Sequence, residues 1–565
     1  MSVNAEKILS SRWWYLLPAI GIAAYLLSVV QLADNTPKLD DLNDVFGFFK
    51  QLALANTPLQ KTSAFFYPNN EHITLVNHLI YYAQYCLLGE IRFYPLILIG
   101  HLIVIATGLL LAIAANHTRQ PFYFAVVALA YINLHYWDST FKAMTAISNQ
   151  AVILFAIASL FSLLRWHHFL LAIVFALLAT FSQGNGIIIW PLGLLALFLE
   201  PHWQTVRGRY IAIWVCCALL SLCIYYWAQH TLGTPSPVTA AMVFSLFQAQ
   251  PTLPVFSVLA FLGSTALLPT QTYLAIAIGI GALLILLWTM RSTTRPDRLI
   301  MLIALFLLAS AVIAGVSRGL AAGNITGVLE SRYKMYSIAL VMLVLTQIVK
   351  KPAQHALVAG VMLVIALCIH SSGYRNISAI RQQAQQFSES YQYWLEDGDL
   401  RRQTVYFPPM SDHFLFVAEH LRLFDFMQLA QFEAIMQPLP AESGHKCPQT
   451  PAPADHCPMT IQHHGNAIAI AIDVHQPALP ANITLCDEQA NTVMEFTIPV
   501  TVSLEKPASQ QHWLIPEADI PAGNYRVLFQ PDQQAACETH LIKKPRKVKT
   551  EMRTLFGGVS ISGQP

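Results

Sequence analysis

The sequence predicts a mainly α-helical polytopic membrane protein, a bundle of about eleven spans followed by an extracytoplasmic α+β domain with a small β-sandwich. Its 565 residues are 55% apolar and only 11% charged, whereas soluble domains carry about 25% charged residues. The mean hydropathy is +0.48. Of the 64 Lys, Arg, Asp and Glu residues, 30 lie in residues 1–372 and 34 in the remaining 193. This composition excludes a nucleic-acid partner, a cytosolic enzyme and an outer-membrane barrel.

The uneven charge divides the chain into three predicted parts. Residues 1–372 form the transmembrane domain, and residues 373–445 form a polar extracytoplasmic segment with helical spacing of apolar side chains. Residues 446–565 alternate short apolar runs with turn residues, which is the pattern of a β-sandwich. The strands are expected at residues 467–474, 481–486, 493–500, 512–515, 525–529 and 538–542.

Eleven apolar stretches are candidates for spans, although several are shorter than the roughly 17–25 residues that a crossing helix needs. They cover residues 13–32, 93–115, 121–136, 150–164, 167–181, 186–199, 210–229, 273–290, 299–316, 336–349 and 355–371. Lys and Arg gather in alternate loops, so the positive-inside rule places the N-terminus in the cytoplasm and the C-terminal domain outside. Residues 253–268 would reverse this parity and are therefore predicted as a re-entrant or interfacial helix.

Four of the nine cysteines lie in the domain predicted to be outside, where an oxidising compartment favours disulfides. Of the three pairings that four cysteines allow, Cys447–Cys457 and Cys486–Cys537 are favoured. A zinc site is the alternative, but the domain has no Cys-x-x-Cys pair. The other five cysteines lie in or beside apolar helices and are expected to act as small apolar residues.

The first outer loop, residues 33–92, concentrates acidic groups that could act as general bases. Asp40, Asp41 and Asp44 precede an amphipathic helix expected at residues 45–55, and Glu71 and His72 precede a second one at residues 73–88. The alternative role for the three aspartates is to cap the first helix. The alternative for Glu71 and His72 is a turn after Pro68.

A second outer loop carries cations that suit a phosphate group. Arg318, Arg332 and Lys334 lie within 17 residues of each other, with Tyr333 between the last two. Snorkelling at a helix end is the alternative. Lys142, with Asp138, is a weaker candidate in another outer loop.

Three segments resemble the GT-C superfamily of membrane glycosyltransferases, in particular its uncharacterised bacterial branch. The first is Asn69-Asn70-Glu71-His72, followed by Gly89-Glu90-Ile91-Arg92-Phe93-Tyr94-Pro95. The second runs from Phe181-Ser182-Gln183-Gly184-Asn185-Gly186 to Trp190-Pro191-Leu192-Gly193-Leu194, and the third from Ser317-Arg318-Gly319 through Gly327 to Ser331-Arg332-Tyr333. The resemblance covers about residues 1–372.

The resemblance implies a GT-C-like fold and transfer of a sugar from a polyprenyl-phosphate donor on the outer face of the bacterial inner membrane. Its first catalytic acid best matches Asp41, with Asp40 and Asp44 as near alternatives, and its second acid matches Glu71. Glu71 and His72 would position the acceptor or a divalent cation (Mg²⁺ or Mn²⁺), and no nucleotide cofactor is expected.

We therefore expect an inverting glycosyltransferase with a periplasmic C-terminal domain. In this hypothesis Asp41 deprotonates the acceptor hydroxyl and Arg332, with Lys334 and Arg318, neutralises the leaving phosphate. The acceptor is a glycan, a lipid or a protein, and membrane lipid surrounds the bundle. The competing hypotheses are a non-enzymatic transporter and a scaffold for the assembly of cell-surface polysaccharide.

Overall fold

The computed structural model describes most of the helical region and the strands near the C-terminus. It covers residues 8–70, 72–116, 120–232, 240–265, 272–292, 297–348 and 352–397, then short pieces between 414 and 435 and strands between 459 and 543. The chain forms two compact units, Met1–Phe387 with Val405–Phe424, and Ser388–Thr404 with Asp425–Pro565.

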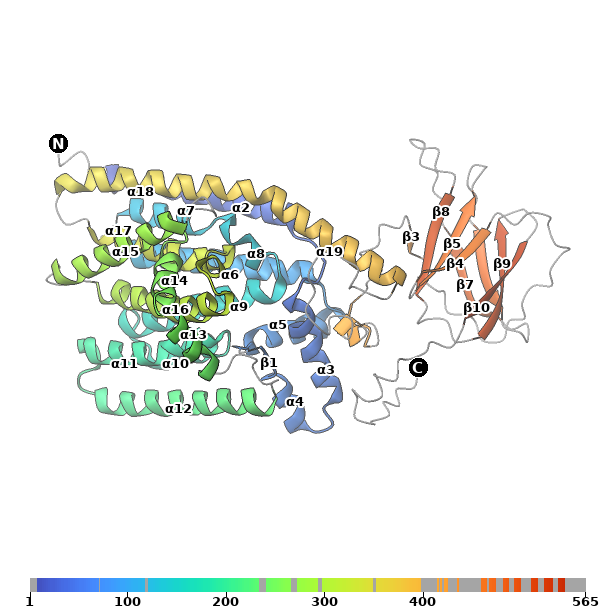
Figure 1. Cartoon of the computed structure of the whole chain (residues 1–565), viewed down its shortest axis with the longest axis horizontal. Coiled ribbons are helices and arrows are strands. Elements are labelled where there is room, and N and C mark those ends of the chain that lie inside the picture. Colours follow the sequence, from blue (N-terminus) through green and yellow to red (C-terminus); the bar gives the residue numbers. More distant parts are fainter. Residues whose placement is uncertain are drawn as a thin grey trace. The chain divides into compact units, whose positions relative to one another are not determined.

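The described part of the first unit is almost entirely helical (Figure 1). Its longer helices are α2 (Leu16–Leu32), α6 (Phe93–Ala115), α7 (Pro121–Tyr131), α9 (Ala143–Leu164), α10 (Phe169–Thr180), α11 (Ile189–Leu199), α12 (Arg207–Thr231), α13 (Ala240–Ala249), α14 (Leu253–Leu262), α15 (Thr272–Ser292), α16 (Arg298–Ala322), α17 (Lys334–Ile348), α18 (Pro352–Gly373) and α19 (Ile377–Asp397). Each of the eleven predicted spans coincides with one of these helices.

Seven helical stretches within the described residues are long and apolar enough to cross a membrane. They are Arg12–Leu32, Phe93–Ala115, Ala143–Leu164, Arg207–Thr231, Thr272–Arg291, Arg298–Leu320 and Leu357–Ser388. Their lengths suit a bilayer core of about 30 Å. The chain is therefore a multi-pass membrane protein, while the total of eleven spans stays a prediction.

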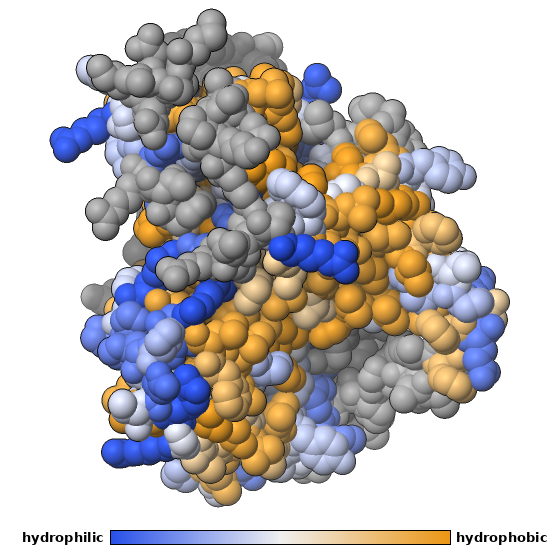
Figure 2. Space-filling view, turned by 90° about the vertical axis from the view of Figure 1, so that its left-hand side faces the viewer, coloured by the Kyte–Doolittle hydropathy of each residue, from blue (hydrophilic) through white to orange (hydrophobic). Residues whose placement is uncertain are grey.

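Apolar side chains cover a large part of the outer surface of this unit. Figure 2 shows a broad hydrophobic area on one face, with hydrophilic side chains gathered mainly toward its margins. Several helices expose large apolar residues, among them Leu170, Leu220 and Tyr226. Such surface is costly in water but suits contact with lipid tails.

Helix α14 occupies the stretch that the sequence predicts as re-entrant or interfacial. Its ten residues span about 15 Å, half of the hydrocarbon thickness. It packs against α15 and α16. A Cβ atom on Gly263 would lie 1.8 Å from the Ala275 carbonyl oxygen, and one on Gly279 would lie 1.9 Å from the Leu259 carbonyl oxygen. Small residues thus let α14 and α15 approach closely, as is common between membrane helices.

Residues 33–92, the predicted first outer loop, fold into a small cap of short elements at one end of the bundle (Figure 1). They are the π-helix η2 (Leu42–Phe46), α3 (Gly47–Leu54), α4 (Pro58–Ala64), the strands β1 (Pro68–Asn69) and β2 (His72–Ile73), and α5 (Leu75–Leu88). The two predicted amphipathic helices correspond to α3 and α5. His72 is the first residue of β2 and pairs with Asn69 across the β1–β2 hairpin.

The second unit contains two four-stranded sheets. Their strands are β3 (Ala434–Ile435), β4 (Met459–His464), β5 (Ala467–Asp473), β6 (Ala481–Cys486), β7 (Thr492–Ile498), β8 (Gln510–Pro516), β9 (Gly523–Pro531) and β10 (Cys537–Lys543). The strand orders are β10-β9-β6-β7 and β3-β8-β5-β4. All six predicted strands overlap strands of these sheets, and the β-sandwich itself stays a prediction.

The strand register does not fit the favoured Cys486–Cys537 disulfide. Strands β6 and β10 lie on opposite sides of β9, where Cys486 pairs with Arg526 and Cys537 pairs with Phe529. Two strand spacings already amount to about 9.5 Å, whereas a disulfide needs Cα atoms within about 7 Å. That pairing is therefore wrong for this register. Cys447 and Cys457 lie outside the described residues.

Candidate functional site

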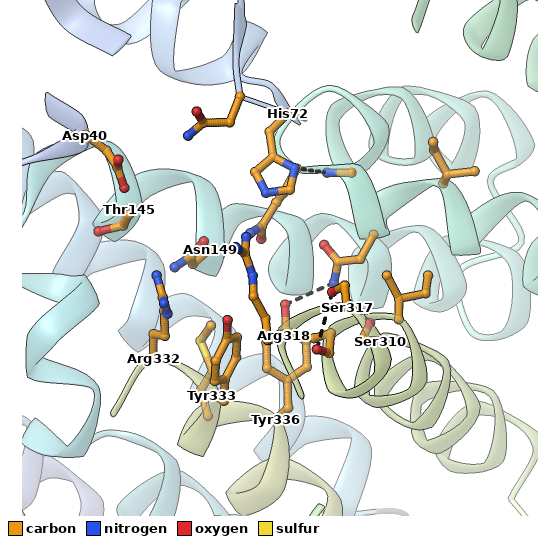
Figure 3. A pocket seen from close by; sticks show the side chains of 18 of the residues that line it. Asp40, His72, Thr145, Asn149, Ser310, Ser317, Arg318, Arg332, Tyr333 and Tyr336 are labelled. Carbon is orange, nitrogen blue, oxygen red and sulfur yellow. Dashed lines mark hydrogen bonds between the residues drawn. The ribbon is translucent and has the colours of Figure 1, made fainter. Parts of the chain in front are cut away.

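A cavity of about 400 Å³ lies beside the cap of the helical unit (Figure 3). Its wall is formed by several segments: the first outer loop, α9, the break between α10 and α11, α16 and the loop before α17. The polar and charged lining residues are Asp40, Asn70, His72, Thr145, Asn149, Gln183, Asn185, Tyr225, Ser310, Ser317, Arg318, Arg332, Tyr333 and Tyr336. Met144, Ile187, Ile313, Ala314 and Met335 make another part of the wall apolar.

Asp40 is the acidic side chain among the described residues that reaches this cavity. It follows Leu39, whose φ of +48° lies in the left-handed region that residues other than glycine rarely adopt. The turn is tied by the Lys38 backbone N–H, which donates to Asp41 Oδ2 at 3.0 Å. Burial raises the pKa of Asp40, and the charges of Lys142, Arg332 and Arg318 oppose the rise. A carboxyl group with a raised pKa is a stronger base when ionised.

Asp41, the residue that best matches the superfamily's first acid, does not line the cavity. Its side chain is fully buried and accepts hydrogen bonds from the backbone N–H groups of Ala143 and Met144 at 3.2 and 2.7 Å. These are the first two residues of α9, whose own N-cap, Lys142, makes no side-chain cap. Asp41 is therefore an N-cap supplied from a distant part of the sequence. Asp41 is thus a cap, but for α9 and not for the helix directly after it, which the capping alternative named.

Asp44 is also fully buried, within a network of side chains. Its carboxylate accepts hydrogen bonds from the Thr74 hydroxyl at 2.6 Å and the Tyr81 hydroxyl at 2.9 Å. The His78 Nε2 atom lies 3.5 Å away. Asp44 thus joins η2 to α5 and is also no direct candidate for the base.

Two of the predicted cations line the cavity. Arg332 forms an ion pair with Glu330, and its buried Nε has no hydrogen-bond partner. Although burial opposes it, the neighbouring Tyr333, Glu330 and Asp138 keep the pKa of Arg332 above its ordinary value. Arg318 comes from α16 and shares a side-chain hydrogen bond with Tyr333. In Figure 3, Arg332 and Asp40 lie on one side of the view and Arg318 reaches toward Asn149 and His72.

The other two predicted cations do not reach the cavity. Lys142 donates to Asp138 Oδ1 at 2.7 Å and is mostly buried. Its charge still acts on Asp40, where it opposes the rise in pKa that burial causes. Lys334 is buried at the first position of α17, one residue beyond the lining residue Tyr333. Neither Lys142 nor Lys334 lines this cavity, and their predicted contact with the substrate stays a prediction.

His72 connects the hairpin to the break between α10 and α11. The Gly184 backbone N–H donates to His72 Nδ1 at 3.4 Å. An acceptor role for Nδ1 places the proton of a neutral imidazole on Nε2. Glu71 lies outside the described residues, so its predicted role stays a prediction.

Several lining residues were missed from the sequence because they are single polar side chains within apolar helices. Asn149 and Thr145 lie in the first two turns of α9, and Ser310 lies in the middle of α16. Isolated polar groups in apolar spans are a known sign of functional sites, and this signal could have identified them.

No group of three His, Cys, Asp or Glu side chains that could hold a metal ion is present among the described residues. Asp40 and His72 are the cavity-lining residues of a metal-binding type. A divalent cation therefore stays a prediction.

No protein-family model, curated protein or solved structure matches this chain.

Proposed function

We propose that the protein is a membrane glycosyltransferase that moves a sugar from a polyprenyl-phosphate donor to a hydroxyl acceptor on the outer face of the bacterial inner membrane. The observation that carries this proposal is that one carboxylate, Asp40, shares a cavity with two guanidinium groups, Arg318 and Arg332. An inverting transfer needs a base for the acceptor and cations for the leaving phosphate. The apolar wall near Ile313 suits the start of a lipid chain.

In the proposed reaction Asp40 takes the proton of the acceptor hydroxyl while its oxygen attacks the anomeric carbon. The bond between that carbon and the phosphate oxygen breaks, and the polyprenyl phosphate leaves with its negative charge facing Arg318 and Arg332. Guanidinium groups bind phosphate through paired N–H donors. The attack comes from the face opposite the phosphate, so the configuration at the anomeric carbon inverts.

This assignment moves the base from Asp41, the best match from the resemblance, to its neighbour Asp40. Both carboxylate oxygens of Asp41 accept hydrogen bonds from the start of α9. Asp40 instead lines the cavity, where the hydroxyl substrate could bind. The acceptor class, glycan, lipid or protein, stays open.

The test compares Asp40→Asn with Glu90→Gln in purified protein reconstituted in nanodiscs. Glu90 lies in the same outer loop and pairs with Arg92 at 2.6 Å, but it does not line the cavity. The assay supplies polyprenyl-phosphate-linked glucose, galactose, mannose and N-acetylglucosamine with a membrane extract as acceptor, and it measures release of polyprenyl phosphate. We expect Asp40→Asn to lower the rate by about a hundredfold or more, and Glu90→Gln to keep it.

If the wild-type protein consumes none of these donors, the glycosyltransferase proposal is wrong and the transporter or scaffold hypothesis should replace it. If the wild type is active and Asp40→Asn is equally active, Asp40 is not the base.

A further inference from the structure

We propose that Gln183 and Asn185 form a hydroxyl-binding subsite that holds the ring of a phosphate-linked sugar. This inference rests on the proposed function and adds the part of the cavity that recognises the sugar. It starts from two buried oxygen atoms. Gln183 Oε1 and Asn185 Oδ1 have no hydrogen-bond partner, and both residues line the cavity.

The segment that carries these two residues is held firmly. It is the break between α10 and α11, where the short helix η5 (Gly184–Ile188) follows Gln183. A Cβ atom on Gly186 would lie 1.9 Å from the Ala179 carbonyl oxygen, so η5 packs directly on the end of α10. Trp190 Nε1 also donates to Thr180 Oγ1 at 2.9 Å and joins α11 to α10.

Two hydrogen bonds hold the amide of Asn185 in place. Its Nδ2 atom donates to Ser310 Oγ and to Tyr336 OH, both at 3.0 Å, and Figure 3 marks both bonds. Both amide protons are thus used within the protein, and the carbonyl oxygen is left as an acceptor. Buried acceptors without partners are rare in proteins, because they lose their bonds to water on folding.

The chemistry of the missing partner follows from these acceptors. A carbonyl oxygen needs a proton donor, and an ionised phosphate or an isoprenoid chain has none. The hydroxyl groups of a sugar ring supply several donors on one rigid frame. The guanidinium groups of Arg318 and Arg332 in the same cavity can take the phosphate to which such a ring is attached. In this arrangement the two amides bind the sugar ring and the two arginines bind its phosphate.

The test is a binding measurement on the full-length protein in nanodiscs, with two kinds of probe. One probe is polyprenyl phosphate without a sugar, and the other is the same lipid carrying glucose, galactose, mannose or N-acetylglucosamine. We expect the wild type to bind at least one sugar-bearing lipid more tightly than the bare lipid. Gln183→Met keeps the length of the side chain but removes the carbonyl oxygen. It should therefore lower the affinity for that sugar-bearing lipid about threefold to tenfold. Its affinity for the bare lipid should not change.

Gln120→Met is the matched control. Gln120 Oε1 is also buried without a partner, but the residue lies at the N-cap of α7 and does not line the cavity. The control should bind both probes like the wild type.

Each remaining outcome contradicts a distinct claim. A wild type that binds neither probe contradicts the proposed function and this inference together. If the wild type binds the bare lipid at least as tightly as every sugar-bearing lipid, the subsite does not exist, although the phosphate site does. Equal weakening of both probes by Gln183→Met would mean that Gln183 only shapes the cavity, and no effect on either probe would mean that it holds no hydroxyl.

Discussion

Two adjacent aspartates, Asp40 and Asp41, have different environments, and the sequence alone could not separate them. Local pattern predicts only that acids near a helix start can cap it, and it would assign all three aspartates to the helix that follows. Asp41 instead caps α9, about a hundred residues further along the chain. Contacts between distant segments leave no signature in a single sequence, so the sequence could not show that Asp41 is engaged at the start of α9 while Asp40 lines the cavity.

Asp41→Asn should therefore act mainly on stability. Asparagine keeps one acceptor oxygen but places N–H donors against the Ala143 and Met144 N–H groups, so at least one cap bond is lost. We expect the free energy of unfolding to fall by about 1–2 kcal/mol at neutral pH. Thermal unfolding in detergent, followed by tryptophan fluorescence, would measure this. A variant as stable as the wild type would remove Asp41 from the cap.

The pH dependence of stability should also change in Asp41→Asn. Burial raises the pKa of Asp41 from 3.8 to about 7, against the effect of its three backbone hydrogen bonds. A raised pKa in the folded state means that folding favours the protonated form, so this contribution to stability is present below about pH 4 and is lost as the pH rises to about 7. The Tm of the wild type should thus rise, relative to that of Asp41→Asn, when the pH is lowered from 7.5 to 5. A constant difference in Tm between the two proteins would contradict the shift.

At the scale of elements, apolar runs identified the helices but not their ends. The predicted span at residues 150–164 begins seven residues too late, because the polar start of α9 faces the cavity and its cap comes from Asp41. Helix α4 was missed although its sequence contains a local signal. Thr57 and Gln60 form a capping box with Pro58 at the first turn.

The close packing of α6 on α9 gives a prediction at this scale. A Cβ atom on Gly100 would lie 2.4 Å from Ala146 Cβ and 2.9 Å from its backbone carbonyl carbon. Gly100→Ala should therefore push the helices apart and destabilise the protein by about 1–3 kcal/mol. It should also slow transfer, since α9 carries Thr145 and Asn149 of the cavity. Unfolding and transfer assays on the reconstituted protein would measure both effects.

The double variant Gly100→Ala with Ala146→Gly should recover much of the lost stability, because the methyl group added on α6 then takes the place of the one removed from α9. Gly360→Ala is the control, since no atom lies within 4 Å of a Cβ atom placed there. A harmless Gly100→Ala would show that α6 and α9 are not packed this closely.

For the whole molecule, the orientation depends on whether α14 crosses the membrane. Ten residues reach about 15 Å of the roughly 30 Å core, and the close contact of Gly263 with α15 holds α14 within the bundle. If α14 does not cross, eight predicted spans precede Thr294, and the cluster of arginines around it lies in the cytoplasm as the positive-inside rule expects.

A reporter fused after Thr294 can decide between the two cases. We expect alkaline phosphatase to be inactive and green fluorescent protein to fluoresce there, with the reverse for fusions after Asp397. Fusions after Gln204 precede α14 and should report the cytoplasm in either case. An active phosphatase after Thr294 would make α14 a span and place the C-terminal unit in the cytoplasm. That topology would also put Arg318 and Arg332, which follow α14, on the opposite side from Asp40 and His72, which precede it, and would therefore contradict the cavity itself.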